Sequence, residues 1–178
     1  TTLTLSKVLV RNTRNHREFK LPARLLADNP EKILNDPEID IVVELMGGYE
    51  PARSYILKAM ESGKDVVTAN KALLAVHGEE IFTRAQRHGI DIGFEASVGG
   101  GIPIIRTLKE GLVGDRNRAL YAILNGTCNY ILTTMEDKGE SFQEALANAQ
   151  QLGYAEADPS FDINGIDVAH KLAILVIL

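Results

Sequence analysis

The sequence is poor in the residues and patterns that mark several large classes of protein. Its 178 residues include one cysteine, Cys128, and no tryptophan. A single cysteine excludes an internal disulfide and a cysteine-based metal cluster, and it is typical of a reducing compartment, so we expect a cytoplasmic protein. No apolar run reaches the roughly 18 residues of a membrane-spanning helix, so we expect no membrane partner.

Positive charge is also in short supply. The chain has 19 Lys and Arg against 24 Asp and Glu, which gives a net charge of −5, and its pI is about 5.4. Because nucleic-acid binding depends on basic side chains that neutralise phosphates, we expect no nucleic-acid partner. Hydrophobic residues make up 45% and charged residues 24%. This balance predicts a folded globular chain, long enough for one ordinary domain or two small ones.

The first hundred residues alternate between strand and helix patterns. We expect strands at residues 5–10, 39–43, 65–68 and 90–94, and helices at 30–34, 51–62 and 79–88. Residues 39–43 are mostly β-branched, which is typical of a parallel strand buried on both faces. Strands separated by helices of this length predict an α/β fold built from βαβ units around a parallel sheet.

Ligands of parallel sheets bind at the carboxyl ends of the strands, which lie here at residues 44–48, 68–71 and 95–101. Lys71 follows one of these strands, although a lone loop lysine is more often simply solvated. Three glycines at 99–101 precede a helix that begins at Pro103. This arrangement suits either a ligand that approaches the backbone or a hinge between domains.

The second half of the chain has a different pattern. We expect a helix at 103–111, a strand at 119–124, a turn at 125–127 into a helix, and a capping box in which Ser141 and Glu144 begin another helix. The apolar stripe of that last helix comprises Ala145, Leu146, Ala149 and Leu152. We place a domain change near residues 99–103, which predicts domains at 1–102 and 103–178.

Two groups of charged residues lie near the end of the chain. Asp167 and Lys171 are spaced i, i+4 on an apolar helix, so they can form an ion pair there. A partly buried lysine beside a carboxylate can exchange a proton near neutral pH, whereas an exposed pair is an ordinary surface contact. Glu156, Asp158 and Asp162 precede this helix and suit either an ammonium ligand or loop and cap chemistry.

Taken together, six segments resemble homoserine dehydrogenase. They are ELMGG (44–48), VTANKAL (67–73), EASVGGGIPII (95–105), LNGT (124–127), GYAEADP (153–159) and GIDVAHKL (165–172). The resemblance implies a partial Rossmann-like parallel sheet, the nucleotide-binding domain, followed by part of an α+β catalytic and dimerisation domain. It also implies a homodimer that interconverts L-homoserine and L-aspartate 4-semialdehyde with NAD or NADP, in threonine and methionine biosynthesis.

The resemblance also assigns roles to individual residues. Lys171 would be the proton donor and acceptor, with Asp167 supporting it. The substrate-binding residues would be Lys71, Glu156, Asp162, Tyr154 and Thr127. The cofactor-binding residues would be Arg11, Gly47, Gly48, Lys71 and Gly99. Backbone carbonyls of Glu95, Val98, Gly100 and Ile102 would bind sodium or another monovalent cation.

The sequence departs from the family pattern at two places. The glycine-rich phosphate loop of the family is absent from these residues and would precede residue 1. The family commonly has Thr at the position of Cys128. In addition, Arg11 and Arg14 follow the first strand, where an NAD enzyme usually has an acidic residue, so we expect a preference for NADP.

The two ends of the sequence suggest a piece of a longer protein. Residue 1 is Thr, and the last residues, 172–178, are all apolar. Because a helix that is apolar all round needs burial on every side, we expect further chain to cover it. Two alternatives to a stand-alone dehydrogenase follow: a non-catalytic folding or dimerisation module, or the dehydrogenase part of a bifunctional aspartokinase–homoserine dehydrogenase.

Overall fold

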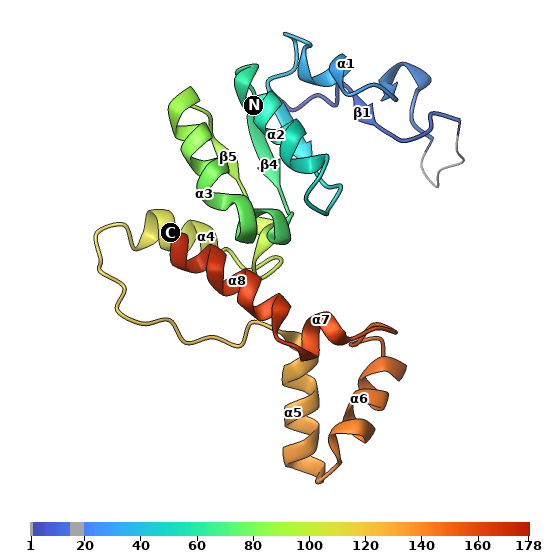
Figure 1. Ribbon diagram of the computed structural model, residues 1–178, viewed down its shortest axis with the longest axis vertical. Coiled ribbons are helices and arrows are strands. Elements are labelled where there is room, and N and C mark those ends of the chain that lie inside the picture. Colours follow the sequence, from blue (N-terminus) through green and yellow to red (C-terminus); the bar gives the residue numbers. More distant parts are fainter. Residues whose placement is uncertain (1, 15–19) are drawn as a thin grey trace. The chain divides into compact units, whose positions relative to one another are not determined.

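The computed structural model describes residues 2–14 and 20–178, and these divide into two compact units. The first unit comprises the chain up to Leu73 together with His77–Phe94, and the second comprises Leu74–Val76 and Glu95–Leu178. Figure 1 shows the elements of both units along the chain. His16, one of four histidines that we expect to play no catalytic part, lies outside the described residues.

The first unit contains parallel strands, as the sequence pattern predicts. β3 (Ile41–Glu44), β4 (Asp65–Thr68) and β5 (Ile92–Gly93) form a three-stranded parallel sheet in that order. β1 (Val8–Leu9) and β2 (Leu26–Ala27) form a separate parallel pair, and they flank the short turn η1 (Ala23–Leu25). β4 has the predicted bounds, whereas β1 and β5 are shorter than the strands expected at 5–10 and 90–94.

Three helices accompany these strands: α1 (Glu31–Leu34), α2 (Ala52–Glu61) and α3 (Lys71–His88). α2 lies where it is predicted, with Ile56 and Met60 fully buried on its apolar face. α3 begins eight residues earlier than the expected start at residue 79. The side chain of Asn70 caps this earlier start by accepting a hydrogen bond from the backbone N–H of Leu73, 3.2 Å away. Lys71 is therefore the first residue of a helix and not a loop residue.

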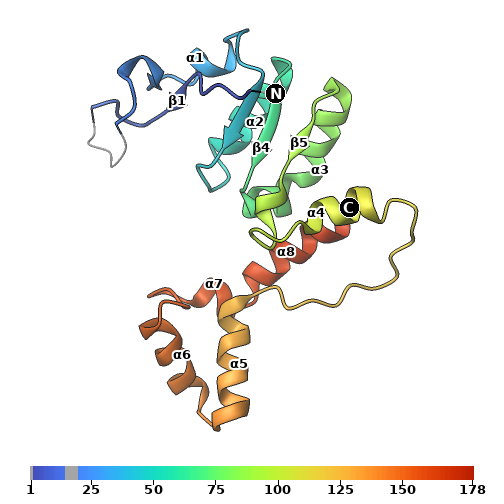
Figure 2. The same ribbon diagram turned by 180° about the vertical axis from the view of Figure 1, so that it is seen from behind.

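One face of the three-stranded sheet is open. Figures 1 and 2, which view the chain from opposite sides, show α2 and α3 along the same side of the strands. Side chains of β4 that face the helices are buried, Val66 and Thr68 among them. On the other face, Ile41 is 43% exposed and Val43 58% exposed. The expectation that residues 39–43 are buried on both faces is wrong, because within the described residues helices pack on one face only.

The second unit opens with short turns of helix. η2 (Glu95–Ser97) is followed by α4 (Ile104–Arg106), which continues into a wider turn, η3 (Thr107–Gly111). The prediction of a strand at 119–124 is wrong: this segment has no regular secondary structure, and Tyr121 is 94% exposed. A strand needs the backbone of a neighbour for its hydrogen bonds, and the described part of this unit contains no second strand.

The rest of the second unit is helical. α5 (Gly126–Lys138) and α6 (Phe142–Gln151) pack side by side around Ile131, Ala145 and Ala149. The predicted capping box at the start of α6 is confirmed, with Ser141 and Glu144 bonded reciprocally. Leu152 is 62% exposed and does not belong to the buried stripe.

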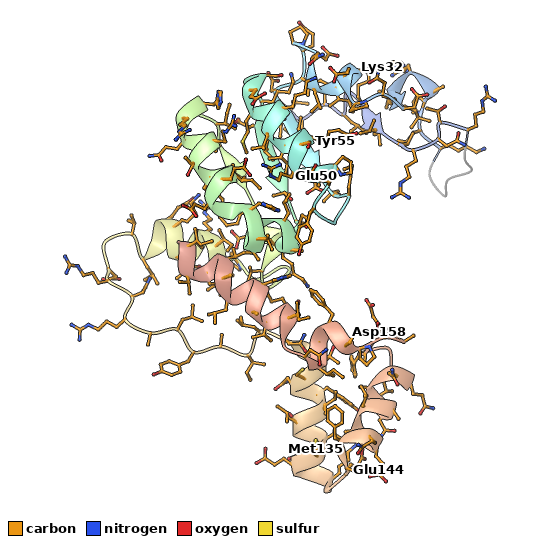
Figure 3. All side chains as sticks on the ribbon, in the orientation of Figure 1. Lys32, Glu50, Tyr55, Met135, Glu144 and Asp158 are labelled. Carbon is orange, nitrogen blue, oxygen red and sulfur yellow. The ribbon has the colours of Figure 1, made fainter. Side chains whose placement is uncertain are left out.

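α7 (Ser160–Ile163) and α8 (Ile166–Ile177) complete this unit. Figure 3 shows Asp158 beside α7, at the opposite end of the α5–α6 pair from Met135 and Glu144. The final turn of α8 is not buried all round, since Val176 is 73% exposed among the described residues. No helix in the described ranges is long and apolar enough to cross a membrane.

Candidate active site

An ion pair on α8 forms the centre of the candidate site. The Nζ atom of Lys171 lies 2.7 Å from Oδ2 of Asp167, one turn earlier on the same helix, and 2.6 Å from the carbonyl oxygen of Leu124. The side chain of Asp167 is 3% exposed and that of Lys171 is 19% exposed. The i, i+4 spacing therefore produces the pair, and the apolar flanks of α8 place it largely out of water.

Asn125 joins this pair to a second carboxylate. Its side-chain Nδ2 donates hydrogen bonds to Oδ2 of Asp167 and to Oδ1 of Asp162, both over 2.8 Å. Asn125 is also the N-cap of α5, because its Oδ1 accepts a hydrogen bond from the backbone N–H of Cys128. One buried amide thus connects the start of α5 with acidic residues on α7 and α8.

Thr127 and Tyr154 extend the network on the side of Asp162. The hydroxyl of Thr127 lies 2.7 Å from the backbone carbonyl oxygen of Tyr154 and 3.1 Å from Oδ2 of Asp162. The ring of Tyr154 packs on that of Tyr130, with centroids 5.0 Å apart, so Tyr154 enters the network through its carbonyl and not through its phenol.

Cys128, at the position where the family resemblance leads us to expect Thr, lies beside Asp162. Its Sγ atom is 3.4 Å from the backbone carbonyl oxygen of Asp162. Burial raises the pKa of the Cys128 thiol, and the nearby carboxylates of Asp162 and Asp167 raise it further. The thiol is therefore neutral at physiological pH and acts as a weak hydrogen-bond donor.

The acidic loop before α7 does not enter the network as a whole. Glu156 is exposed, and its backbone carbonyl accepts a hydrogen bond from the side chain of Gln150. Asp158 accepts hydrogen bonds from the hydroxyl and the backbone N–H of Ser160, which lower the pKa of its carboxyl group. Of the three acidic residues, Asp162 joins the network around Lys171, and Asp158 bonds locally to Ser160 in the turn before α7.

In the first unit, polar side chains gather at the carboxyl ends of β3 and β4. Glu44 is 5% exposed, and its Oε1 accepts hydrogen bonds from the backbone N–H groups of Met46 and Gly47. Its other oxygen, Oε2, accepts a hydrogen bond from the hydroxyl of Thr68 over 2.7 Å. A buried carboxylate thus holds the turn that follows β3 against the end of β4.

The same set of contacts continues to the start of α3. The Thr68 hydroxyl oxygen accepts from the backbone N–H of Asn70, and the Asn70 amide donates to the carbonyl oxygen of Gly48 over 2.7 Å. Gly47 and Gly48 both have positive φ, and no atom lies within 4 Å of a Cβ added at either one. Their backbone is therefore open to a ligand. The hydrogen bond from Asn70 links Gly48 to the N-terminus of α3, where Lys71 is the first residue.

Arg11 lies in the same unit, exposed and two residues after the end of β1. Among the described residues, no hydrogen bond or ion pair joins Arg11 to the groups at the carboxyl ends of β3 and β4. Glu44, Thr68 and Asn70 were not predicted as functional residues. The sequence signal that could have identified them is their position at the carboxyl ends of two adjacent parallel strands.

The segment with the expected cation ligands lies at the start of the second unit. The Glu95 carboxylate accepts hydrogen bonds from the backbone N–H groups of Ile105 and Arg106, so it caps α4. Gly99 and Gly100 have φ of 76° and 60°, a conformation that favours glycine. In the described ranges, no group of three or more His, Cys, Asp and Glu side chains has a metal-binding arrangement. The ligands expected in this segment are backbone carbonyl oxygens.

Comparisons with known proteins identify the family. A family model for homoserine dehydrogenase matches residues 103–178, and a model for the homoserine dehydrogenase NAD binding domain matches residues 1–95. Homoserine dehydrogenase of Synechocystis sp. is 54% identical over 169 residues, which are 95% of this chain and 39% of that protein.

Solved structures agree with this result. The crystal structure of a homoserine dehydrogenase from Thiobacillus denitrificans has a TM-score of 0.79 at 59% identity, over 84% of this chain and 35% of that one. A hyperthermophilic archaeal homoserine dehydrogenase in complex with NADPH has a TM-score of 0.75 at 34% identity, over 83% of this chain and 46% of that one. The chain therefore spans less than half of these relatives, and it belongs to the homoserine dehydrogenase family.

Proposed function

We propose that the protein containing this chain interconverts L-homoserine and L-aspartate 4-semialdehyde with NAD or NADP. The observation that carries the proposal is the Lys171–Asp167 pair, which lies out of water and is linked through Asn125 to Asp162. Such an arrangement supplies what alcohol oxidation requires of the protein: an amine that takes a proton from the hydroxyl group, and carboxylates that hold a cationic substrate.

Lys171 moves the proton in this proposal. When the alcohol is oxidised, the neutral amine of Lys171 takes the hydroxyl proton, and when the aldehyde is reduced the ammonium returns it. The bound nicotinamide supplies the hydride chemistry. Asp167 and the Leu124 carbonyl, 2.7 and 2.6 Å from Nζ, stabilise the ammonium and fix its direction.

The substrate's amino-acid end is cationic at its ammonium group, and the second unit offers acidic and carbonyl oxygens for it. Asp162, the Tyr154 carbonyl and the Thr127 hydroxyl lie within one set of hydrogen bonds. We assign these three groups to the substrate ammonium. Glu156 is exposed in the adjacent loop and is assigned to the same group on the basis of the family resemblance.

The first unit is assigned to the cofactor, and its residues fit a dinucleotide. The open backbone at Gly47 and Gly48 allows close approach of a ligand, and the N-terminus of α3 with Lys71 favours phosphate. The matching NAD binding domain model and the NADPH complex of the archaeal relative support this assignment. We further assign the exposed Arg11 to a 2′-phosphate, which favours NADP over NAD.

The turn at residues 95–102 is assigned to a monovalent cation, sodium among the candidates. The proposed ligands are the carbonyl oxygens of Glu95, Val98, Gly100 and Ile102, and oxygen is the donor that hard cations prefer. The carbonyls of Glu95 and Ile102 already accept hydrogen bonds from Val98 and Ile104. Each keeps a second lone pair for a cation.

The remaining assignments rest on the family resemblance and on composition. We propose that residues 1–102 bind nucleotide, that residues 103–178 contribute to substrate binding and catalysis, and that the protein is a cytoplasmic homodimer. The apolar side chains of the segment around Tyr121 are exposed, which is consistent with another protein surface, such as that of a second subunit, covering them. Light scattering of the purified full-length protein would give the oligomeric state.

The test of the activity is a spectrophotometric assay of the full-length protein. Nicotinamide absorbance is followed with homoserine and each oxidised cofactor, and kcat/KM for NADP is compared with that for NAD. Turnover with homoserine supports the dehydrogenase, and a higher kcat/KM for NADP supports the role of Arg11. Absence of turnover in folded, cofactor-binding protein would favour the non-catalytic alternative.

A further inference from the structure

We infer that Asn125 is a positioning residue that holds the proton-transfer carboxylate Asp167 and the substrate carboxylate Asp162 on one amide group. The roles given to the two aspartates rest on the proposed function, whereas the hydrogen bonds of Asn125 to them are observed directly. Asn125 is 6% exposed and Asp167 is 2% exposed, so water contributes little to their hydrogen bonding.

Every polar function of the Asn125 side chain is in use. The two N–H bonds of Nδ2 point to Asp162 and Asp167, each over 2.8 Å, and Oδ1 accepts from the backbone N–H of Cys128 over 2.8 Å. The opposite orientation of the amide would place Oδ1 against two carboxylates and Nδ2 against an N–H group. The network therefore fixes the orientation, and with it the separation of the two aspartates.

The Asn125 amide also stabilises two neighbouring carboxylates, those of Asp162 and Asp167, by donating a hydrogen bond to each. Asp167 has Lys171 as a counter-charge, whereas Asp162 meets only neutral groups in this network, the amide of Asn125 and the hydroxyl of Thr127. The Thr127 hydroxyl lies closer to the carbonyl oxygen of Tyr154, at 2.7 Å, than to Oδ2 of Asp162, at 3.1 Å, so it is the weaker donor to Asp162. Asn125 is thus the main hydrogen-bond donor to the Asp162 carboxylate in this network.

Titratable groups reach the Asn125 network from three helices. Asp162 of α7 and Asp167 of α8 both accept from the Asn125 amide, and Lys171 pairs with Asp167. On α5, the thiol of Cys128 lies 3.4 Å from the backbone carbonyl oxygen of Asp162. A further carboxylate placed at residue 125 would lie within hydrogen-bond distance of both aspartates. Close carboxylates do not all ionise together, so one of the three would take up a proton near neutral pH.

Helix capping is the alternative role of Asn125, and substitutions separate the two roles. Ser and Asp are N-cap residues as good as Asn, so Asn125→Ser and Asn125→Asp both retain the cap of α5. Neither variant retains the two N–H donors. If capping is the whole role, both variants behave as the wild type does, and if the bridge is the role, both are impaired.

Steady-state kinetics of the full-length protein provides the first test. We expect Asn125→Ser to lose about ten- to a hundred-fold in kcat/KM, the effect of losing hydrogen bonds to charged groups, with both kcat and the KM for homoserine affected. We expect a loss of similar size in Asn125→Asp at neutral pH that diminishes in acid. Ser141→Asn, which changes the N-cap residue of α6 and keeps a cap there, is the control and should leave both constants unchanged.

Thermal unfolding as a function of pH provides a second test that is independent of activity. In Asn125→Asp, repulsion between the three crowded carboxylates raises their pKa and destabilises the folded state at pH values above that pKa. Protonation of one carboxyl group removes the repulsion as the pH falls. The Tm deficit of Asn125→Asp should therefore shrink between about pH 8 and about pH 5, and by more than that of Asn125→Ser, which adds no third carboxylate. Wild-type kinetics and Tm in both variants would overturn the bridge. If the wild type lacks dehydrogenase activity, the Tm profiles still decide the bridge, and only the proposed function fails.

Discussion

The ammonium of Lys171 lies 2.7 Å from a carboxylate oxygen of Asp167, one turn earlier on α8. The same ammonium reaches the carbonyl oxygen of Leu124, the residue before the α5 cap. An amine with two fixed acceptors has a defined direction, which proton transfer to a substrate requires.

Loss of the Asp167 charge should damage both stability and catalysis. In Asp167→Asn the side chain keeps its shape, but Lys171 and Asn125 lose their common charged partner. Breaking a buried ion pair at one end costs about 3 kcal/mol, so the free energy of unfolding should fall by roughly that amount and kcat by at least about ten-fold. Urea unfolding and steady-state kinetics measure the two effects. Unchanged stability would show that the pair is solvated.

Cys128 should be a slow nucleophile in the folded protein. Because burial and two neighbouring carboxylates raise the pKa of its thiol, the thiolate fraction at neutral pH lies below that of a free cysteine. Alkylation by iodoacetamide, followed by mass spectrometry, should be slower in the folded than in the urea-unfolded chain and should accelerate with rising pH. A folded-state rate at pH 7 that equals the unfolded rate would contradict this environment.

The buried contacts between Glu44 and Thr68 should support cofactor binding. Thr68→Val removes one donor to the Glu44 carboxylate and the acceptor for the Asn70 N–H. We expect a loss of about 1–3 kcal/mol in stability and weaker NADPH binding, measured by urea unfolding and by fluorescence titration. Val67→Thr, on the exposed face of the same strand, is the matched control and should change neither. Equal behaviour of the two variants would refute the role of this contact.

The α6 capping box should contribute a pH-dependent part of stability. Hydrogen bonds from Ser141 lower the pKa of the Glu144 carboxyl, so its contribution is present above its unfolded-state pKa and is lost as pH falls through the lower folded-state value. Glu144→Gln should therefore be less stable than the wild type at neutral pH, and the difference should narrow in acid. A difference in Tm that is constant with pH would contradict the carboxylate's role.

Local patterns in the sequence predicted local structure well. The i, i+4 spacing of Asp167 and Lys171 matches an observed ion pair, the bounds of β4 are those expected, and the box at Ser141 is formed. Each of these could be recognised from a pattern within a few consecutive positions of the sequence. The family motifs predicted the family, which the matching domain models confirm.

Features that depend on distant residues were not predictable in this way. Asn125 contacts Asp162 and Asp167, which are 37 and 42 positions away, and no spacing rule links an N-cap residue to such partners. The segment at 119–124 has the composition of a strand, but its strand state needs a neighbouring backbone. Glu44 and Thr68 meet because their strands are adjacent in register, which the sheet order determines.

The central claim is that Lys171 carries the proton, and its replacement tests that claim most directly. Lys171→Ala is compared with Lys138→Ala, which removes an exposed lysine from α5, in the full-length protein. We predict that Lys171→Ala lowers kcat by about 100- to 10,000-fold while NADPH binding and the circular dichroism spectrum stay those of the wild type. Near-normal turnover in folded Lys171→Ala would contradict the account.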